Sequence, residues 1–187
     1  EMKEATTPYV AEFERWSTNG AASDPGWLKE RRTQAISRFS DVGFPTTRQE
    51  EWRFTDVKAI ARTEFVLAKE ATVADWKPHL LGGDDQHVAV FVNGRFSKEL
   101  SSLAGLPENV RVCGIGEAFE SDTQVVEQHL GRLASTERSA LAALNTAFLG
   151  DGAFVHISDK VVLDRPIQLL FLSVPSPDRS TVQHPRS

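Results

Sequence analysis

A helix stop near the start of the chain separates a helical first part from a second part that forms mostly strands. Gly43 can adopt the left-handed conformation that ends helices, and Pro45 prevents the helix from continuing. Thr47 and Glu50 have the spacing of a capping box, in which each side chain accepts a hydrogen bond from the other residue's backbone N–H. The sequence therefore predicts that one helix ends at Gly43 and that a short helix carrying Trp52 begins soon afterwards.

A second N-cap, Thr55-Asp56, follows so closely that Trp52 and Phe54 are expected in a tight helix-turn-helix corner. Large aromatic side chains contribute most often to core packing, so we interpret both as core residues rather than as ligand contacts. The corner by itself indicates no reaction.

Two amphipathic helices are predicted before the stop. In the first, Thr7-Pro8 supplies a cap and first turn, and Tyr9, Phe13 and Trp16 recur on one face. The second begins at Asp24-Pro25, and one side of it carries Leu28, Arg32, Ala35, Ile36 and Phe39. We expect the two helices to pair as a hairpin with a buried aromatic face, although such a hairpin could also dock a partner protein.

A β-hairpin gives the strongest signal after the corner. His87 to Val92 is apolar and β-branched, Asn93-Gly94 suits a two-residue type I′ turn, and Arg95 to Ser97 returns. Weaker patterns predict a short strand at 64–67, a short helix at 73–81 and a strand at 109–115. Cys113 lies in that last strand and is expected to be a small buried side chain, because no histidine or basic cluster adjoins it.

In the last third of the chain, the spacing of apolar residues changes from a helical period to a strand period. Residues 122–133 and 137–149 have the helical period, and Gly150-Asp151-Gly152 breaks it. Residues 154–157, 161–163 and 167–174 then have strand character, which suits either a sandwich or a β-solenoid. The chain is therefore predicted to be an α+β protein with a helical and mixed domain at 1–150 and a strand domain at 151–187.

Composition excludes several classes of protein. A chain of 187 residues can bury a core without a disulfide or a metal, and its net charge of −5 argues against general nucleic-acid binding. Its one cysteine excludes an internal disulfide and fits a reducing compartment. No apolar run approaches the roughly 20 residues of a membrane span, and the N-terminus lacks the apolar core of a signal peptide. We expect a cytoplasmic protein that binds neither nucleic acid nor membranes.

No catalytic, cofactor-binding or metal-binding residue is predicted. No G-x-x-x-x-G-K-[ST] loop occurs, and Gly114-Ile115-Gly116 lacks the third glycine of a dinucleotide site. Gly150-Asp151-Gly152 with Asp159 is interpreted as a turn rather than a calcium loop, and the neighbours Glu50-Glu51 do not face each other on a helix. The five histidines lack the spacing of a metal site: His79, His87, His129, His156 and His184. Among them, His184 is the strongest candidate for a metal ligand, because it lies at the end of the chain's strand pattern.

One ordered series of motifs resembles the SufD family, whose members are subunits of the SufBCD iron–sulfur cluster assembly complex. The family's signature near its N-terminus is G-aliphatic-P-T…E-x-W-basic-aromatic-T, matched here by Gly43, Pro45, Thr46, Glu50, Trp52, Arg53, Phe54 and Thr55. Phe44 and Phe54 stand where leucine and tyrosine are common. Further matches follow in the family's order at 91–96, 144–148, 151–152 and 165–167.

The resemblance implies a fold and a role. It selects the solenoid, because members of this family have a right-handed parallel β-helix core, so 151–187 is expected to hold its first coils. It implies a non-catalytic scaffold subunit that works through SufB-like and SufC-like (ATPase) partners, leaves a homodimer open, and assigns the iron–sulfur cluster to the whole complex rather than to residues of this chain. The chain is expected to be an N-terminal piece of a longer protein. A β-helix polysaccharide-active enzyme and a SufB-like scaffold subunit are the alternatives.

Overall fold

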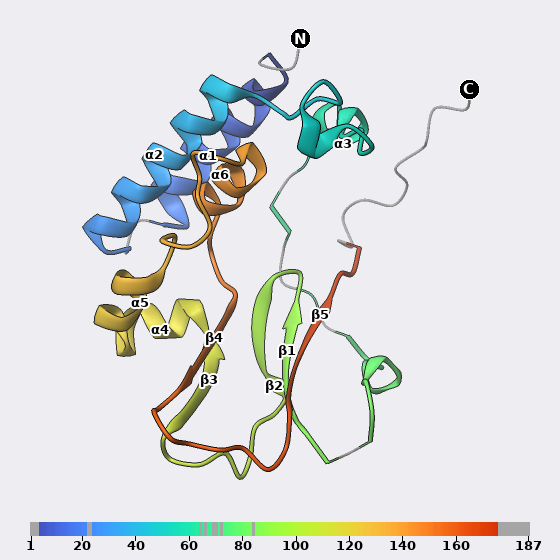
Figure 1. The fold of residues 1–187 in the computed structure, drawn as a ribbon, viewed down its shortest axis with the longest axis vertical. Helices are drawn as coiled ribbons and strands as arrows, with labels where there is room; N and C mark the ends of the chain where they lie inside the picture. The colour runs from blue at the N-terminus through green and yellow to red at the C-terminus, as the bar shows by residue number, and fades with distance from the viewer. Residues whose placement is uncertain are drawn as a thin grey trace. The chain divides into compact units, whose positions relative to one another are not determined.

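The computed structural model describes residues 4–21, 24–63, 65, 67–68, 71, 73–83 and 85–175. They form an α+β protein of two compact units, as the sequence predicted for the fold class (Figure 1). The first unit comprises the described residues within 1–66 and 119–150, and the second those within 67–118 and 151–187. Each unit is therefore built from two separate stretches of the chain, and one of the boundaries falls between Gly150 and Asp151.

The first unit is helical. Its α-helices are α1 (Thr7–Asn19), α2 (Gly26–Val42), α3 (Lys58–Ala61), α5 (Thr123–His129) and α6 (Ala140–Ala147), and α4 (Ile115–Ser121) runs into it from the second unit. The hairpin prediction is only partly right, because α2 packs mainly against α6 and to a smaller extent against α1. Small side chains explain this preference, since Ala143 and Ala147 are fully buried and let α6 approach closely.

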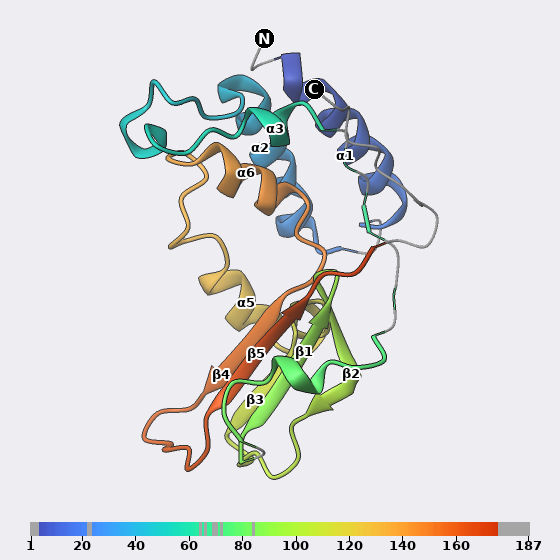
Figure 2. The same ribbon diagram turned by 90° about the vertical axis from the view of Figure 1, so that its right-hand side faces the viewer.

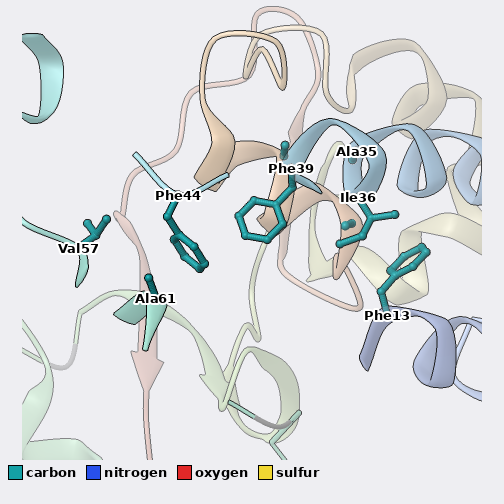
Figure 3. Close-up of a cluster of buried hydrophobic side chains, with 9 residues drawn as sticks. Phe13, Ala35, Ile36, Phe39, Phe44, Val57 and Ala61 are labelled. Carbon is teal, nitrogen blue, oxygen red and sulfur yellow. The ribbon is translucent and has the colours of Figure 1, made fainter. Parts of the chain in front are cut away.

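The core of the first unit is a cluster of aromatic and small side chains, shown in Figure 3 and made up of Phe13, Ala35, Ile36, Phe39, Phe44, Val57, Ala61, Ala143 and Ala147. Phe39 and Phe44 meet edge to face with ring centroids 5.0 Å apart, and Tyr9 packs on both. Each fully buried phenylalanine contributes roughly 1.5–3 kcal/mol. Gly43, with φ of 76°, ends α2 as predicted and directs Phe44 into this core.

Arg32 lies on the buried side of α2, where the sequence placed it among apolar residues. Its side chain is only 3% exposed. The guanidinium donates to the Asp24 carboxylate and to the Leu149 carbonyl, and it lies 4.7 Å from the centroid of the Trp16 ring. This charged group therefore joins the start of α2, the face of α1 and the end of α6.

The second unit consists of two small sheets, visible in Figure 2. One has the order β2 (Arg95–Ser102), β1 (His87–Val92), β5 (Ile167–Leu172), with β1–β2 antiparallel and β1–β5 parallel. The other pairs β3 (Val110–Gly114) antiparallel with β4 (Ala153–Ile157). The predicted hairpin is confirmed, because Asn93 and Gly94 both have positive φ, as a type I′ turn requires.

Strand β1 is buried on both faces. Val88, Val90 and Val92 face one cluster with Leu170 of β5. Ala89 and Phe91 face the other way, onto Val110 and Val112 of β3 and the partly buried Ala153 and Ile167. The two sheets thus share an apolar layer, which explains the continuous apolar run of β1.

Several local predictions were wrong. The Thr47–Glu50 capping box does not form, since Glu50–Trp52 is a 3-10 turn whose preceding residue, Gln49, makes no side-chain cap. The predicted helix at 73–81 is likewise reduced to the 3-10 turn Lys77–His79, and 161–163 is not a strand. Residues 64 and 66 of the predicted strand at 64–67 lie outside the described residues.

The helices before β4 are shorter than their patterns. Residues 122–133 supply only α5, whereas α4 begins directly after β3 where the sequence indicated continued strand. Residues 137–149 supply α6, whose N-cap Ser139 accepts a hydrogen bond from the Ala142 N–H. No β-helix coil is present among the described residues, because β4 and β5 belong to different sheets.

Candidate functional site

An apolar groove of about 650 Å³ lies between β4 and β5 in the second unit. Val155 and Ile157 of β4 form one wall, Ile167 and Leu169 of β5 form the other, and residues 163–166 of the connecting loop close one end. Sequence patterns gave these residues as strands but did not indicate that they would be exposed.

Strand register explains why apolar side chains line this groove. Val155 and Ile157 pair with Val112 and Val110, so they lie on the face of β4 that continues the shared apolar layer. On β5, Phe171 pairs with Phe91 and stacks on its ring at a centroid distance of 4.6 Å. These strands therefore present core-facing side chains.

The groove is open because β4 and β5 are both edge strands. Among the described residues, each pairs with a strand on one side only. Phe171 is 58% exposed and Val155 41% exposed although both lie on core-facing positions. Uncovered apolar surface of this kind, next to unpaired strand edges, marks an interaction site.

Charged groups occupy one end of the groove. Of the residues that line it, Asp164 and Arg165 carry charge, and Arg165 Nε lies 3.8 Å from Asp85 Oδ1. The pKa of the nearby buried His87 is lowered mainly by burial and further by Arg165, while Asp85 opposes the shift. This lining suits apolar side chains and lacks the row of acidic and basic residues that a polysaccharide-active site needs.

The Trp52 corner differs from its prediction at one of its two aromatics. Trp52 packs against the core of the first unit, as expected, but Phe54 is 92% exposed. The Arg53 guanidinium lies 5.4 Å from the centroid of the Phe54 ring. The Asp56 carboxylate accepts a hydrogen bond from the Lys58 N–H, but the N-cap of α3 is Val57, which makes no side-chain cap, so the predicted cap at Thr55-Asp56 is one residue early. Phe54 projects from an ordered corner because backbone hydrogen bonds between residues 46 and 55 hold the turns.

Asp151 organises the start of β4. Its carboxylate accepts hydrogen bonds from the backbone N–H groups of Phe96, Gly116 and Gly152 at 2.7, 3.1 and 2.8 Å. Gly114 is required beside it, since a Cβ there would come within 2.7 Å of Asp151 Oδ1. The carboxylate therefore binds backbone amides and joins three segments of the second unit.

The other residues weighed from the sequence are scattered. Cys113 is buried, as predicted. Among the described histidines, His87 is buried, whereas the other three are exposed: His79, His129 and His156. His184 lies outside the described residues. Within the described part of the chain, no three potential metal ligands come together, and Glu50 and Glu51 are both exposed.

None of the helices in the described part of the chain combines the length and hydrophobicity that a membrane span requires.

The fold and the groove thus define an α+β protein in which, over the part of the chain that the structure describes, both sheets end in uncovered edges. Comparison with known proteins gives its family. The model of the SufBD protein N-terminal region matches residues 3–169, and the chain belongs to this family.

Three relatives agree with this assignment. An iron-sulfur cluster assembly SufBD family protein of Synechocystis sp. is 31% identical over 158 residues, which cover 83% of this chain and 35% of the relative. A second SufBD family protein, from Arabidopsis thaliana, is 22% identical over 79% of this chain and 36% of its own length. The iron-sulfur cluster assembly protein SufD of Bacillus subtilis is 22% identical over 80% of this chain and 36% of its own length. The chain spans about a third of the length of these curated relatives.

Proposed function

We propose that this chain is the N-terminal part of a SufD-like subunit of an iron–sulfur cluster assembly complex, and that it acts through protein interfaces rather than by catalysis. Family membership and the functions in the relatives' names support the assembly role. The proposed partners are a SufB-like subunit and a SufC-like ATPase, with a homodimer as the alternative assembly, in the cytoplasm. In this proposal the cluster is held by the complex and not by residues of this chain.

The structural observation that supports a SufD-like continuation of the chain is the groove between β4 and β5, which is uncovered among the described residues. We propose that residues from Asp151 onward lead into a right-handed parallel β-helix, whose first coil adds one strand to each open edge. Val155, Ile157, Leu169 and Phe171 would then face the interior of the solenoid. In a solenoid each coil is stabilised mainly by its neighbours, so strands that the first coil should cover leave apolar surface exposed when it is absent. The break in helical pattern at Gly150-Asp151-Gly152 supports a domain boundary between residues 150 and 151.

A deletion and complementation experiment tests the assembly role. Cells that lack the gene should lose activity of several unrelated iron–sulfur enzymes under iron limitation, and the wild-type gene should restore it. A complementing variant with Val155→Asp and Leu169→Asp should fail to restore activity, because two charges would enter the apolar groove. The matched control is Lys98→Asp, an exposed position on β2. Normal iron–sulfur enzyme activities in the deletion strain would contradict the proposal.

A further inference from the structure

A second, smaller cleft lies in the first unit, separate from the groove. It measures about 250 Å³ and is bounded by the end of α2, the Trp52 corner and the start of α6. Its apolar side chains are Val42, Pro45, Trp52 and Ala140. A volume below the usual 300–1,000 Å³ of drug-sized pockets restricts it to a small ligand.

The two polar sides of this cleft carry opposite charge. Glu50 and Glu51 contribute carboxylates from the corner, and Arg138 contributes a guanidinium from the segment before α6. Among the described residues, Glu51 and Arg138 have no ion-pair partner, and Glu50 has only the exposed Arg53 at 4.0 Å. The charges that line the cleft thus do not neutralise one another across it.

The start of α6 adds to the positive side. Ser139 and Ala140 line the cleft, and α6 begins at Ala140. The first N–H groups of a helix have no acceptor within the helix, and the helix dipole favours negative charge at that end. Arg138 and the start of α6 therefore both favour a carboxylate, whereas Glu50 and Glu51 favour an ammonium group.

The cleft is also pre-organised. Backbone hydrogen bonds from Gln49 to Thr46 and from Trp52 to Gln49 fix the corner, and Ser139 fixes the start of α6 through its bond with the Ala142 N–H. Trp52 is held by the core. Binding would consequently require little rearrangement of the backbone, and its cost in conformational entropy would come mainly from the exposed side chains of Glu50, Glu51 and Arg138.

We propose that this cleft binds a small zwitterion of the α-amino-acid class, with its carboxylate toward Arg138 and the start of α6, its ammonium group toward Glu50 and Glu51, and its apolar side chain on Trp52. The inference does not depend on the role in cluster assembly, because it follows from the lining of the cleft alone.

The test uses the ¹⁵N-labelled chain and L-leucine as the probe. The four tryptophans give four indole N–H resonances, and Trp52→Phe assigns the one from the cleft. L-leucine should shift the Trp52 resonance saturably and leave the other three in place. N-acetyl-L-leucine, which lacks the ammonium group, and L-leucinamide, which lacks the carboxylate, should each produce no saturable shift.

Substitutions provide the second arm. Glu51→Gln and Arg138→Gln should each raise the Kd for L-leucine about three- to tenfold, since each removes one charged partner of the ligand. Glu14→Gln, an exposed carboxylate on α1 that does not line the cleft, should leave the Kd unchanged. The proposal is overturned if L-leucine gives no saturable shift up to its solubility limit, or if either derivative binds as well as L-leucine.

Discussion

Replacing Arg32 with methionine should destabilise the first unit more than any exposed charge substitution. Methionine preserves most of the aliphatic stem but removes the guanidinium that donates to Asp24 and to the Leu149 carbonyl. Burial lowers the pKa of Arg32 to about 10, so the group is protonated at neutral pH and its charge is present in the folded state. The variant therefore leaves a carboxylate and a carbonyl without their donor.

The expected magnitude follows from burial. Breaking a buried ion pair by removing one partner costs about 3–5 kcal/mol. The Arg32 Nε has no acceptor among the described residues, so hydrogen bonds do not fully offset the cost of burying the guanidinium. The loss of stability on removing it should therefore lie at the lower end of this range. Loss of the contact with the Trp16 ring at 4.7 Å adds a smaller amount, about 0.5–1 kcal/mol. We expect Arg32→Met to lower the free energy of unfolding by about 3–4 kcal/mol.

Urea unfolding followed by tryptophan fluorescence measures this loss. The matched control is Arg15→Met on α1, where the arginine is 73% exposed and pairs with Glu12, and there the change should be within about 0.5 kcal/mol. The double variant Asp24→Asn with Arg32→Met should cost at least about 1 kcal/mol less than the sum of the two single variants. The reasoning is refuted if Arg32→Met costs no more than Arg15→Met.

Three further perturbations follow from the structure. Asp151→Ala should lower the free energy of unfolding by about 3 kcal/mol, because three backbone N–H groups lose their acceptor. In urea titrations the control Asp159→Ala, at an exposed position, should change this free energy little, and equal effects of the two variants would contradict the role of Asp151. Gly43→Ala should reduce Tm, because an alanine at φ 76° carries a backbone strain of about 1–3 kcal/mol. Gly26→Ala, where no atom lies near the new Cβ, should not reduce Tm, and an unchanged Tm for Gly43→Ala would show that this position is not strained. His87 has a lowered pKa in the folded state, so the unfolded chain binds more protons and stability should fall as pH drops below about 6.5. His87→Gln should flatten that slope in unfolding titrations between pH 5 and 7, and a slope equal to the wild type would exclude this histidine as its source.

Local patterns predicted the elements whose geometry is set by neighbouring residues. The end of α2 at Gly43 and the turn at Asn93-Gly94 both depend on backbone conformations that glycine or asparagine adopt easily, so the residue type was sufficient. The capping box at Thr47 does not form, because the corner folds as a 3-10 turn at Glu50–Trp52 held by backbone hydrogen bonds such as the one from the Trp52 N–H to the Gln49 carbonyl. The Thr47–Glu50 motif is compatible both with a capping box and with the 3-10 turn that the structure shows.

Contacts between distant segments were beyond local patterns. The parallel pairing of β1 with β5 joins residues 80 positions apart, as in His87 with Ile167, and the pairing of β3 with β4 crosses three helices. Arg32 was placed on the correct face of α2, but its partner at Leu149 comes from the other end of the first unit. The candidate groove depends on the same long-range pairings, which is why its strands were predicted while their exposure was not.

The exposed Phe54 illustrates a further limit. An aromatic residue beside a tryptophan that packs on the core predicts a core position, but in this chain Phe54 points to solvent beside Arg53. Trp52 packs on the core while partly buried. Because a 3-10 turn has about three residues per turn, side chains two positions apart point in different directions, so Phe54 does not share the core-facing side of Trp52.

Co-purification tests the central claim most directly. The protein is tagged, co-expressed with the SufB-like and SufC-like proteins of its own organism, and the stoichiometry and ATPase rate of the eluted material are determined. The account predicts a defined complex whose ATPase rate exceeds that of the SufC-like protein alone, and predicts that Val155→Asp with Leu169→Asp disrupts the complex while Lys98→Asp does not. Elution of the protein by itself, with the ATPase rate unchanged, would contradict the account.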